Sequence, residues 1–189
     1  MTKKLLIFFL SAILMTTGVD ISAQNYSKQG SQPFEIVVEP SFERGPRNID
    51  LTAYLKNSSQ QPVRIMLVPF FIMPSMIEVT VIGPDGQPVE PKIPPYGATL
   101  WPTEVKTEEL KPGERVSLSS WEYADKISSG HGGSKSYSWD LASLRGREVT
   151  IFFEYRITDE LAKAIRERNK IALEPVHVKS AGFKVKIPK

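Results

Sequence analysis

Apolar and polar residues alternate at every second position in several runs after residue 33, and this pattern predicts β-strands with one buried face. The clearest run covers residues 49–55, where Ile, Leu, Ala and Leu alternate with Asp, Thr and Tyr. Where the alternation slips, near Ser119 and Ser120, it predicts a β-bulge. Further strands are predicted at residues 34–38, 77–81, 116–121, 149–157 and 183–187.

Three stretches do not alternate. Residues 63–73 are almost continuously apolar, which predicts a strand buried on both faces, although Pro69 argues against one long strand. Residues 88–105 are rich in proline, and we expect extended, partly irregular chain there that ends in a strand at about 98–105. Residues 123–137 are rich in Ser, Gly and Lys, which predicts a mobile loop.

One helix is predicted at residues 159–169. Thr158 can cap its start, and Leu161 and Ile165 supply a narrow apolar stripe. Eight or nine short strands with a single helix favour antiparallel sheets, because parallel strands need repeated crossover connections. The chain is therefore predicted to be all-β, with two sheets packed face to face; a closed barrel is the alternative.

The first 23 residues have the order of a secretory signal peptide: Lys3 and Lys4, an apolar run at 5–15, and a more polar end. We place cleavage between Ala23 and Gln24. An uncleaved anchor is the alternative, but the apolar run is shorter than the ~20 residues of a spanning helix. The predicted domains are 1–23 signal peptide, 24–33 disordered lead-in, and 34–189 a single β-sandwich domain.

The chain has no cysteine, which excludes disulfides, thiol catalysis and a lipid anchor on a cysteine. An exported chain without disulfides fits a bacterial periplasm or cell exterior. No second apolar run is long enough to span a membrane. Loss of the signal peptide lowers the net charge from +3 to +2, which does not favour a nucleic-acid partner.

Two turns carry a resemblance to a known group. The run LTAYLKNSSQQPV at 51–63 resembles a strand and its following turn in secreted bacterial immunoglobulin-like modules, including the proteinase-inhibitor-like immunoglobulin fold group. The run LKPGERV at 110–116 resembles the turn before a later strand of those modules. The resemblance covers residues 34–157 and implies an immunoglobulin-like antiparallel β-sandwich that binds proteins or sugars, or serves as a spacer.

Candidate chemistry is sparse. His131 lies in a glycine-rich run and His177 near the last strand, and two scattered histidines without cysteine do not make the three or four ligands of a zinc site. No Gly-x-Ser-x-Gly elbow supports a serine triad. We therefore predict no catalytic residue, no metal and no cofactor. Carboxylates between residues 104 and 140 (Glu104, Glu108, Glu109, Glu114, Glu122, Asp125 and Asp140) leave a hydrolase as the weakest hypothesis.

Aromatic residues gather between positions 101 and 139. Trp101, Trp121, Tyr123, Tyr137 and Trp139 are the candidate ligand contacts, because aromatic faces stack on sugar rings and anchor protein interfaces. The alternative is that the tryptophans fill the core. Our leading hypothesis is an exported, non-catalytic module that recognises a protein partner. The second is a carbohydrate-binding module that uses the three tryptophans.

Overall fold

The computed structural model describes residues 32–41, 45, 47–67, 76–92, 106–124, 129–132 and 137–189. The predicted signal peptide, residues 24–31 of the predicted lead-in and the strand expected at 98–105 lie outside these residues. The described chain forms eleven strands, more than the eight or nine expected, with one α-helix and one short 3-10 helix. Every strand pair is antiparallel, so the all-β class is confirmed.

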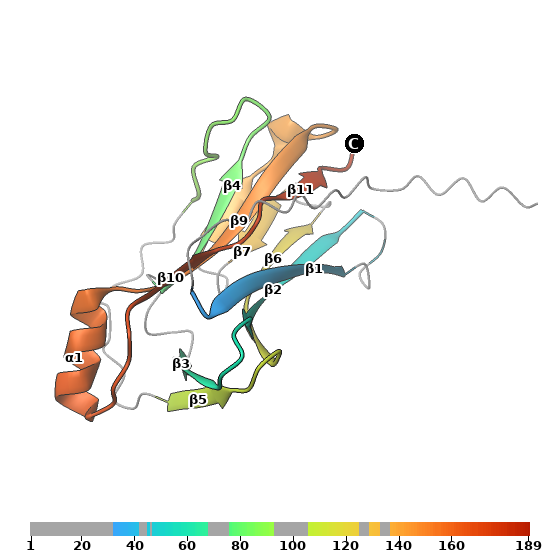
Figure 1. Ribbon diagram of the computed structural model, residues 1–189. Coiled ribbons are helices and arrows are strands. Elements are labelled where there is room, and N and C mark those ends of the chain that lie inside the picture. The colour runs from blue at the N-terminus through green and yellow to red at the C-terminus, as the bar shows by residue number, and fades with distance from the viewer. Residues whose placement is uncertain are drawn as a thin grey trace, which may run out of the picture.

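One sheet has five strands in the order β1-β2-β6-β7-β8 (Figure 1). The strands are β1 (Phe34–Ser41), β2 (Ile49–Asn57), β6 (Arg115–Ala124), β7 (Ser129–Gly132) and β8 (Tyr137–Asp140). In β2 every second residue is buried, as the alternation predicts. Ala53 lies opposite Ser119 but Tyr54 lies opposite Ser117, so Leu118 is the extra residue of a bulge. The predicted bulge is confirmed, one residue before its expected place.

The second sheet is built around β9 (Glu148–Ile157). β4 (Ile77–Ile82) pairs with one edge of β9, and β10 (Val176–Lys179) and β11 (Phe183–Lys186) pair in turn with the other edge. Ser180 continues the pairing between β10 and β11. Its N–H donates to the carbonyl of Phe153 at 2.8 Å, and its Oγ accepts from the N–H of Phe153 at 2.9 Å. A serine side chain therefore replaces backbone pairing where the edge strand is interrupted.

A third, small sheet pairs β3 (Val63–Leu67) with β5 (Lys106–Leu110). β5 is absent from our sequence prediction because KTEEL has a single apolar residue and no alternation. Two side chains of the large sheets form hydrogen bonds to this small sheet. The amide of Asn57 on β2 donates to the carbonyl of Leu110, and the hydroxyl of Tyr155 on β9 donates to the carbonyl of Met66.

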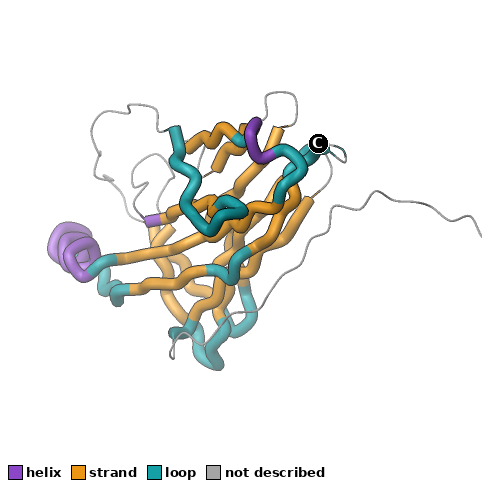
Figure 2. The backbone as a smooth tube through the Cα atoms, turned by 90° about the horizontal axis from the view of Figure 1, so that it is seen from above, coloured by secondary structure: helices purple, strands orange, loops and turns teal. Residues whose placement is uncertain are grey.

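Helix α1 (Asp159–Asn169) has the predicted bounds and the predicted cap. The Oγ1 of Thr158 accepts from the N–H of Leu161 at 3.2 Å. The helix ends at Lys170, which takes the left-handed conformation with φ 56°. Figures 1 and 2 both show α1 at one side of the strands, connected directly to β9 and by a short linker to β10. Ala162 and Ile165 are its buried residues.

Buried side chains from the inner faces of both large sheets join one hydrophobic cluster. β2 and β9 contribute most regularly, with every second residue buried from Ile49 to Asn57 and from Val149 to Ile157. The cluster also takes Ile65 and Met66 from β3 and Ile165 from α1. Burial of apolar surface in this shared core is the main stabilising contribution to such a fold.

Candidate functional site

Three of the five aromatic candidates lie in the core. Trp121 and Tyr123 are 0% exposed, and Trp139 is 1% exposed. A fully buried ring has no free face for a sugar or a protein partner, so their assignment as ligand contacts is corrected: they are core residues. Trp101 and the side chain of Tyr137 lie outside what the structure describes.

The pairing of β7 places these three rings beside glycines in the core. Gly130 of β7 lies opposite Tyr123 on one side and Trp139 on the other, and Gly132 lies opposite Trp121. A glycine leaves a gap on a sheet face, and large cross-strand neighbours can fill it. The predicted mobile loop at 123–137 is thus wrong for residues 129–132, which form a paired strand. Glycines carry no side-chain alternation, so the strand had no signal in the sequence.

The inner face of β6 also carries three buried polar atoms without a hydrogen-bond partner in the described structure. They are Ser119 Oγ, Trp121 Nε1 and the hydroxyl of Tyr123. An unpaired buried polar atom costs about 1–3 kcal/mol, so Trp121 and Tyr123 contribute to the core through the apolar area of their rings rather than through polar contacts. Of the candidates that the structure describes, Trp121, Tyr123 and Trp139 are therefore structural.

The histidines and carboxylates do not converge on a reactive centre within the described residues. His177 Nε2 lies 2.7 Å from Glu154 Oε1 on the outer face of the β9 sheet. No group of three His, Asp or Glu side chains able to hold a metal ion occurs in the described part of the chain. His131 lies in β7 with its backbone in register with Glu122 and Ser138, and its side chain is outside the description.

The candidate carboxylates are spread over the molecule. Glu108 and Glu109 lie on β5 and Glu122 on β6, while Glu104 and Asp125 lie outside the described residues. Two others serve local structure. Glu114 accepts from the N–H of Lys111, and Asp140 accepts from the N–H of Ala142 at the start of the 3-10 helix (Ala142–Leu144). The described candidates are not gathered in one place, so the hydrolase hypothesis gains no support.

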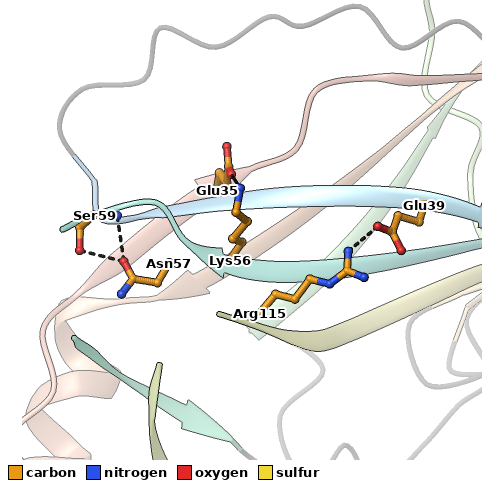
Figure 3. A network of polar contacts seen from close by, with 6 residues as sticks. All are labelled: Glu35, Glu39, Lys56, Asn57, Ser59 and Arg115. Atoms are coloured by element: carbon orange, nitrogen blue, oxygen red, sulfur yellow. Dashed lines mark hydrogen bonds and ion pairs between the residues drawn. The ribbon is translucent and has the colours of Figure 1, made fainter. Parts of the chain in front are cut away.

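The outer face of the five-stranded sheet is a network of paired charges (Figure 3). Lys56 binds Glu35 at 2.7 Å, and Arg115 binds Glu39 while its guanidinium covers the ring of Tyr54 at 4.3 Å. On the other sheet, the ammonium of Lys179 lies 4.8 Å from the centre of the Phe152 ring. The rings of Tyr54 and Phe152, which face outward on the two large sheets, are thus each covered by a cation and form no open apolar patch there.

Asn57 lies at the edge of this network and is fully buried (Figure 3). Its Nδ2 donates to the carbonyls of Gln61 and Leu110 at 2.8 and 2.9 Å. Its Oδ1 accepts from the N–H and the hydroxyl of Ser59 at 2.9 and 2.8 Å. Its backbone N–H and carbonyl also bond, to Glu114 and Gly113. One side chain therefore joins the turn after β2 to the turn between β5 and β6, the same two turns that carry the family resemblance.

An open groove of about 820 Å³ lies at the end of the molecule where β1, β3 and β10 begin. Its floor includes Tyr155 and Ile157 of β9. Its walls are mainly apolar, and prolines stand beside the strand starts. The lining residues are Gln32, Pro33, Phe34, Pro62, Val63, Arg64, Ile65, Tyr155, Ile157, Ala172, Leu173, Glu174, Pro175, Val176 and His177.

Hydrogen bonds fix both walls of the groove. On one wall, the N–H of His177 donates to Oε1 of Gln32 at 3.4 Å, so the last two residues of the predicted lead-in, Gln32 and Pro33, are held against the domain. On the β3 side, the hydroxyl of Tyr155 on the floor donates to the carbonyl of Met66 at 3.3 Å and so holds β3 to β9. Burial raises the pKa of Tyr155, so its hydroxyl keeps its proton and stays a donor.

Sequence reasoning did not find this groove. Its lining comes from four segments far apart in the chain, and only the tertiary structure brings them together. The prolines at positions 33, 62 and 175 were the available signal, since proline before a strand often marks its start. A concave, mostly apolar hollow with a few polar residues is the usual form of a binding site.

A scan of the chain against protein-family models gives no match, and a search of curated proteins finds none with significant sequence similarity. Among the described residues, no helix combines the length and the apolar character needed to cross a membrane.

Proposed function

We propose that this chain is an exported, non-catalytic binding module that holds a protein partner in the groove between β3 and β10. The observation that carries the proposal is the groove itself: about 820 Å³, open to solvent and lined mostly by apolar side chains. Apolar clefts with a small number of polar groups suit recognition better than chemistry when no nucleophile or acid–base pair lies inside. His177 is the residue nearest to such a role, and its imidazole is engaged by Glu154.

We further propose that the two large sheets form an immunoglobulin-like sandwich. The hydrophobic cluster that the two sheets share supports this proposal. So does Asn57, which joins the turn after β2 to the turn between β5 and β6, the two turns that resemble those of immunoglobulin-like modules. Fold analogy does not fix function, so the proposal of a protein partner depends on the groove and not on the architecture.

The structure does not favour a carbohydrate-binding module. Such a module needs a row of exposed tryptophans, and Trp121 and Trp139 are buried. A sugar site also needs several aligned polar groups beside an aromatic face, and the groove has no described tryptophan.

The test uses two exposed alanines as a matched pair. Ala172 lines the groove, whereas Ala142 lies in the 3-10 helix between β8 and β9, away from it. A photo-crosslinking amino acid is placed at either position in the mature chain from residue 24, which is exposed to an envelope extract of the producing cells. We expect a discrete crosslinked protein from position 172 only. In a separate pull-down without the crosslinking amino acid, the Ala172→Arg variant of the mature chain should no longer recover that protein. Equal products from both positions would contradict the groove as the site.

A further inference from the structure

The two walls of the groove belong to different sheets. One wall is β3, which forms the small sheet with β5, and the other is the start of β10, which pairs with β9. The floor, at Tyr155 and Ile157, also belongs to β9. In Figure 1 the small sheet lies at the lower edge of the molecule, below β2. The width of the groove is therefore set by the position of the small sheet against the β9 sheet.

One end of the small sheet is fixed to the five-stranded sheet. The turn from β2 into β3 and the turn from β5 into β6 both lie at the end where Val63 pairs with Leu110. Asn57 binds both turns, because its Nδ2 donates to the carbonyls of Gln61 and Leu110 at 2.8 and 2.9 Å. Since one buried residue holds both connections, this end of the small sheet can act as a pivot.

A hydrogen bond from the groove floor reaches the small sheet further along β3. The hydroxyl of Tyr155 donates to the carbonyl of Met66 at 3.3 Å. Met66 lies three residues beyond Val63, which places this bond about 10 Å from the pivot. A bond at that distance opposes rotation of the small sheet about the pivot. The same tyrosine thus forms the floor of the groove and holds one of its walls.

Packing limits how far the small sheet can move. Ile65 and Met66 of β3 and Leu110 of β5 are 2%, 2% and 3% exposed and belong to the shared core. Detaching them would expose apolar surface, so the sheet can only rotate by a small angle while it stays packed. A two-stranded sheet is marginally stable by itself, so its position depends on contacts with the larger sheets. One neutral hydrogen bond changes a population ratio about twofold to tenfold, enough to decide between two nearby positions.

We propose that the small sheet is a movable wall of the groove, which turns about Asn57 and is held at the described groove width by the bond from Tyr155 to Met66. This inference rests on the proposed function, because it adds a control on partner binding at the same groove. With the bond in place, the groove has the width that the partner needs. Without the bond, β3 moves relative to β10, and binding must first restore that width, which lowers the affinity.

Pulsed electron paramagnetic resonance on the mature chain measures this motion without a partner. The chain has no cysteine, so two introduced cysteines carry the only spin labels. The reporting pair joins the small sheet to the β9 sheet at exposed positions, Glu109→Cys on β5 and Lys186→Cys on β11. The control pair joins the two large sheets, with Ser117→Cys on β6 and Lys186→Cys. Tyr155→Phe should broaden the distance distribution of the reporting pair and leave that of the control pair unchanged.

Partner binding is then measured as the yield of crosslinked protein from position 172 at a limiting amount of extract. Tyr155→Phe should lower the yield about twofold to tenfold, whereas Tyr123→Phe, which removes a buried hydroxyl without a bond in the described structure, should not change it. If the reporting pair does not broaden, if both pairs broaden alike, or if the two variants give equal yields, the movable wall is wrong. A broadened reporting pair with no crosslinked protein from any variant would refute the proposed function and retain the movable wall.

Discussion

Replacing Asn57 with alanine should remove the single side chain that joins the two turns at one end of the molecule. The substitution deletes four hydrogen bonds and leaves the two backbone bonds of the residue in place. Their partners differ in exposure. Ser59 and Gln61 lie at the surface and can bond to water instead, whereas Leu110 is 3% exposed and its carbonyl would stay buried without this donor.

The magnitude follows from that difference. Each of the three bonds to solvent-reachable groups contributes about 0.5 kcal/mol, at the low end for neutral hydrogen bonds. Leaving the buried carbonyl of Leu110 without a donor costs a further amount of stability, about 1–3 kcal/mol. We therefore expect Asn57→Ala to lower the free energy of unfolding by about 2.5–4.5 kcal/mol, equivalent to a fall of roughly 5–18 °C in Tm for a domain of this size.

Asn57→Asp provides a sharper test because it keeps the shape. The introduced carboxylate would face the carbonyl oxygens of Gln61 and Leu110, which repel its charged form, while its protonated form can donate one bond. Its pKa in the folded protein should therefore lie above the value in the unfolded chain. The deficit relative to the wild type should then be smallest below the unfolded pKa and grow as the pH rises through the folded pKa.

Both variants can be measured by urea unfolding of the mature chain, followed by the fluorescence of the buried tryptophans, at pH 4 and pH 7. Ser58→Ala, an exposed neighbour, is the control and should stay within about 0.5 kcal/mol of the wild type. A loss below about 1 kcal/mol for Asn57→Ala would refute the reasoning. So would a deficit for Asn57→Asp that is the same at both pH values.

Three further outcomes are expected. Tyr123→Phe removes a buried hydroxyl without a partner and should leave stability unchanged or raised, whereas Tyr155→Phe breaks a bond and should cost about 0.5–1.5 kcal/mol; equal shifts in urea midpoint would contradict this. Gly182→Ala places a Cβ 2.9 Å from the Phe152 ring and should cost about 1–3 kcal/mol, measured by Tm; an unchanged Tm argues against the contact. Thr158→Ala removes a helix cap and should cost about 1 kcal/mol by urea unfolding, with Thr158→Ser close to wild type.

Strands with one buried face could be predicted from the sequence because their period is local. β2 and β9 alternate through their whole length, and the structure buries every second residue in both. Helix α1 is similar, since its cap at Thr158 and its apolar pair lie within one short segment. In each case neighbouring residues alone carry the signal, so no knowledge of distant contacts is needed.

β5 and β7 could not be predicted in this way. Their sequences, KTEEL and SGHG, have no apolar alternation, and they are strands because backbone groups of β3, β6 and β8 pair with them. The groove depends on distant segments for the same reason. The ends of β1, β3 and β10 meet only once the sheets have formed, and no spacing along the chain records that meeting.

The aromatic residues between 121 and 139 show the limit of what the sequence alone can predict. By itself it determined that large rings gather beside a glycine-rich stretch, in a chain whose alternation requires an all-β fold. Only the tertiary structure decided that Trp121, Tyr123 and Trp139 point inward. The inner face of a strand is set by its register with neighbours, and here that register places the rings beside Gly130 and Gly132, where the gap must be filled.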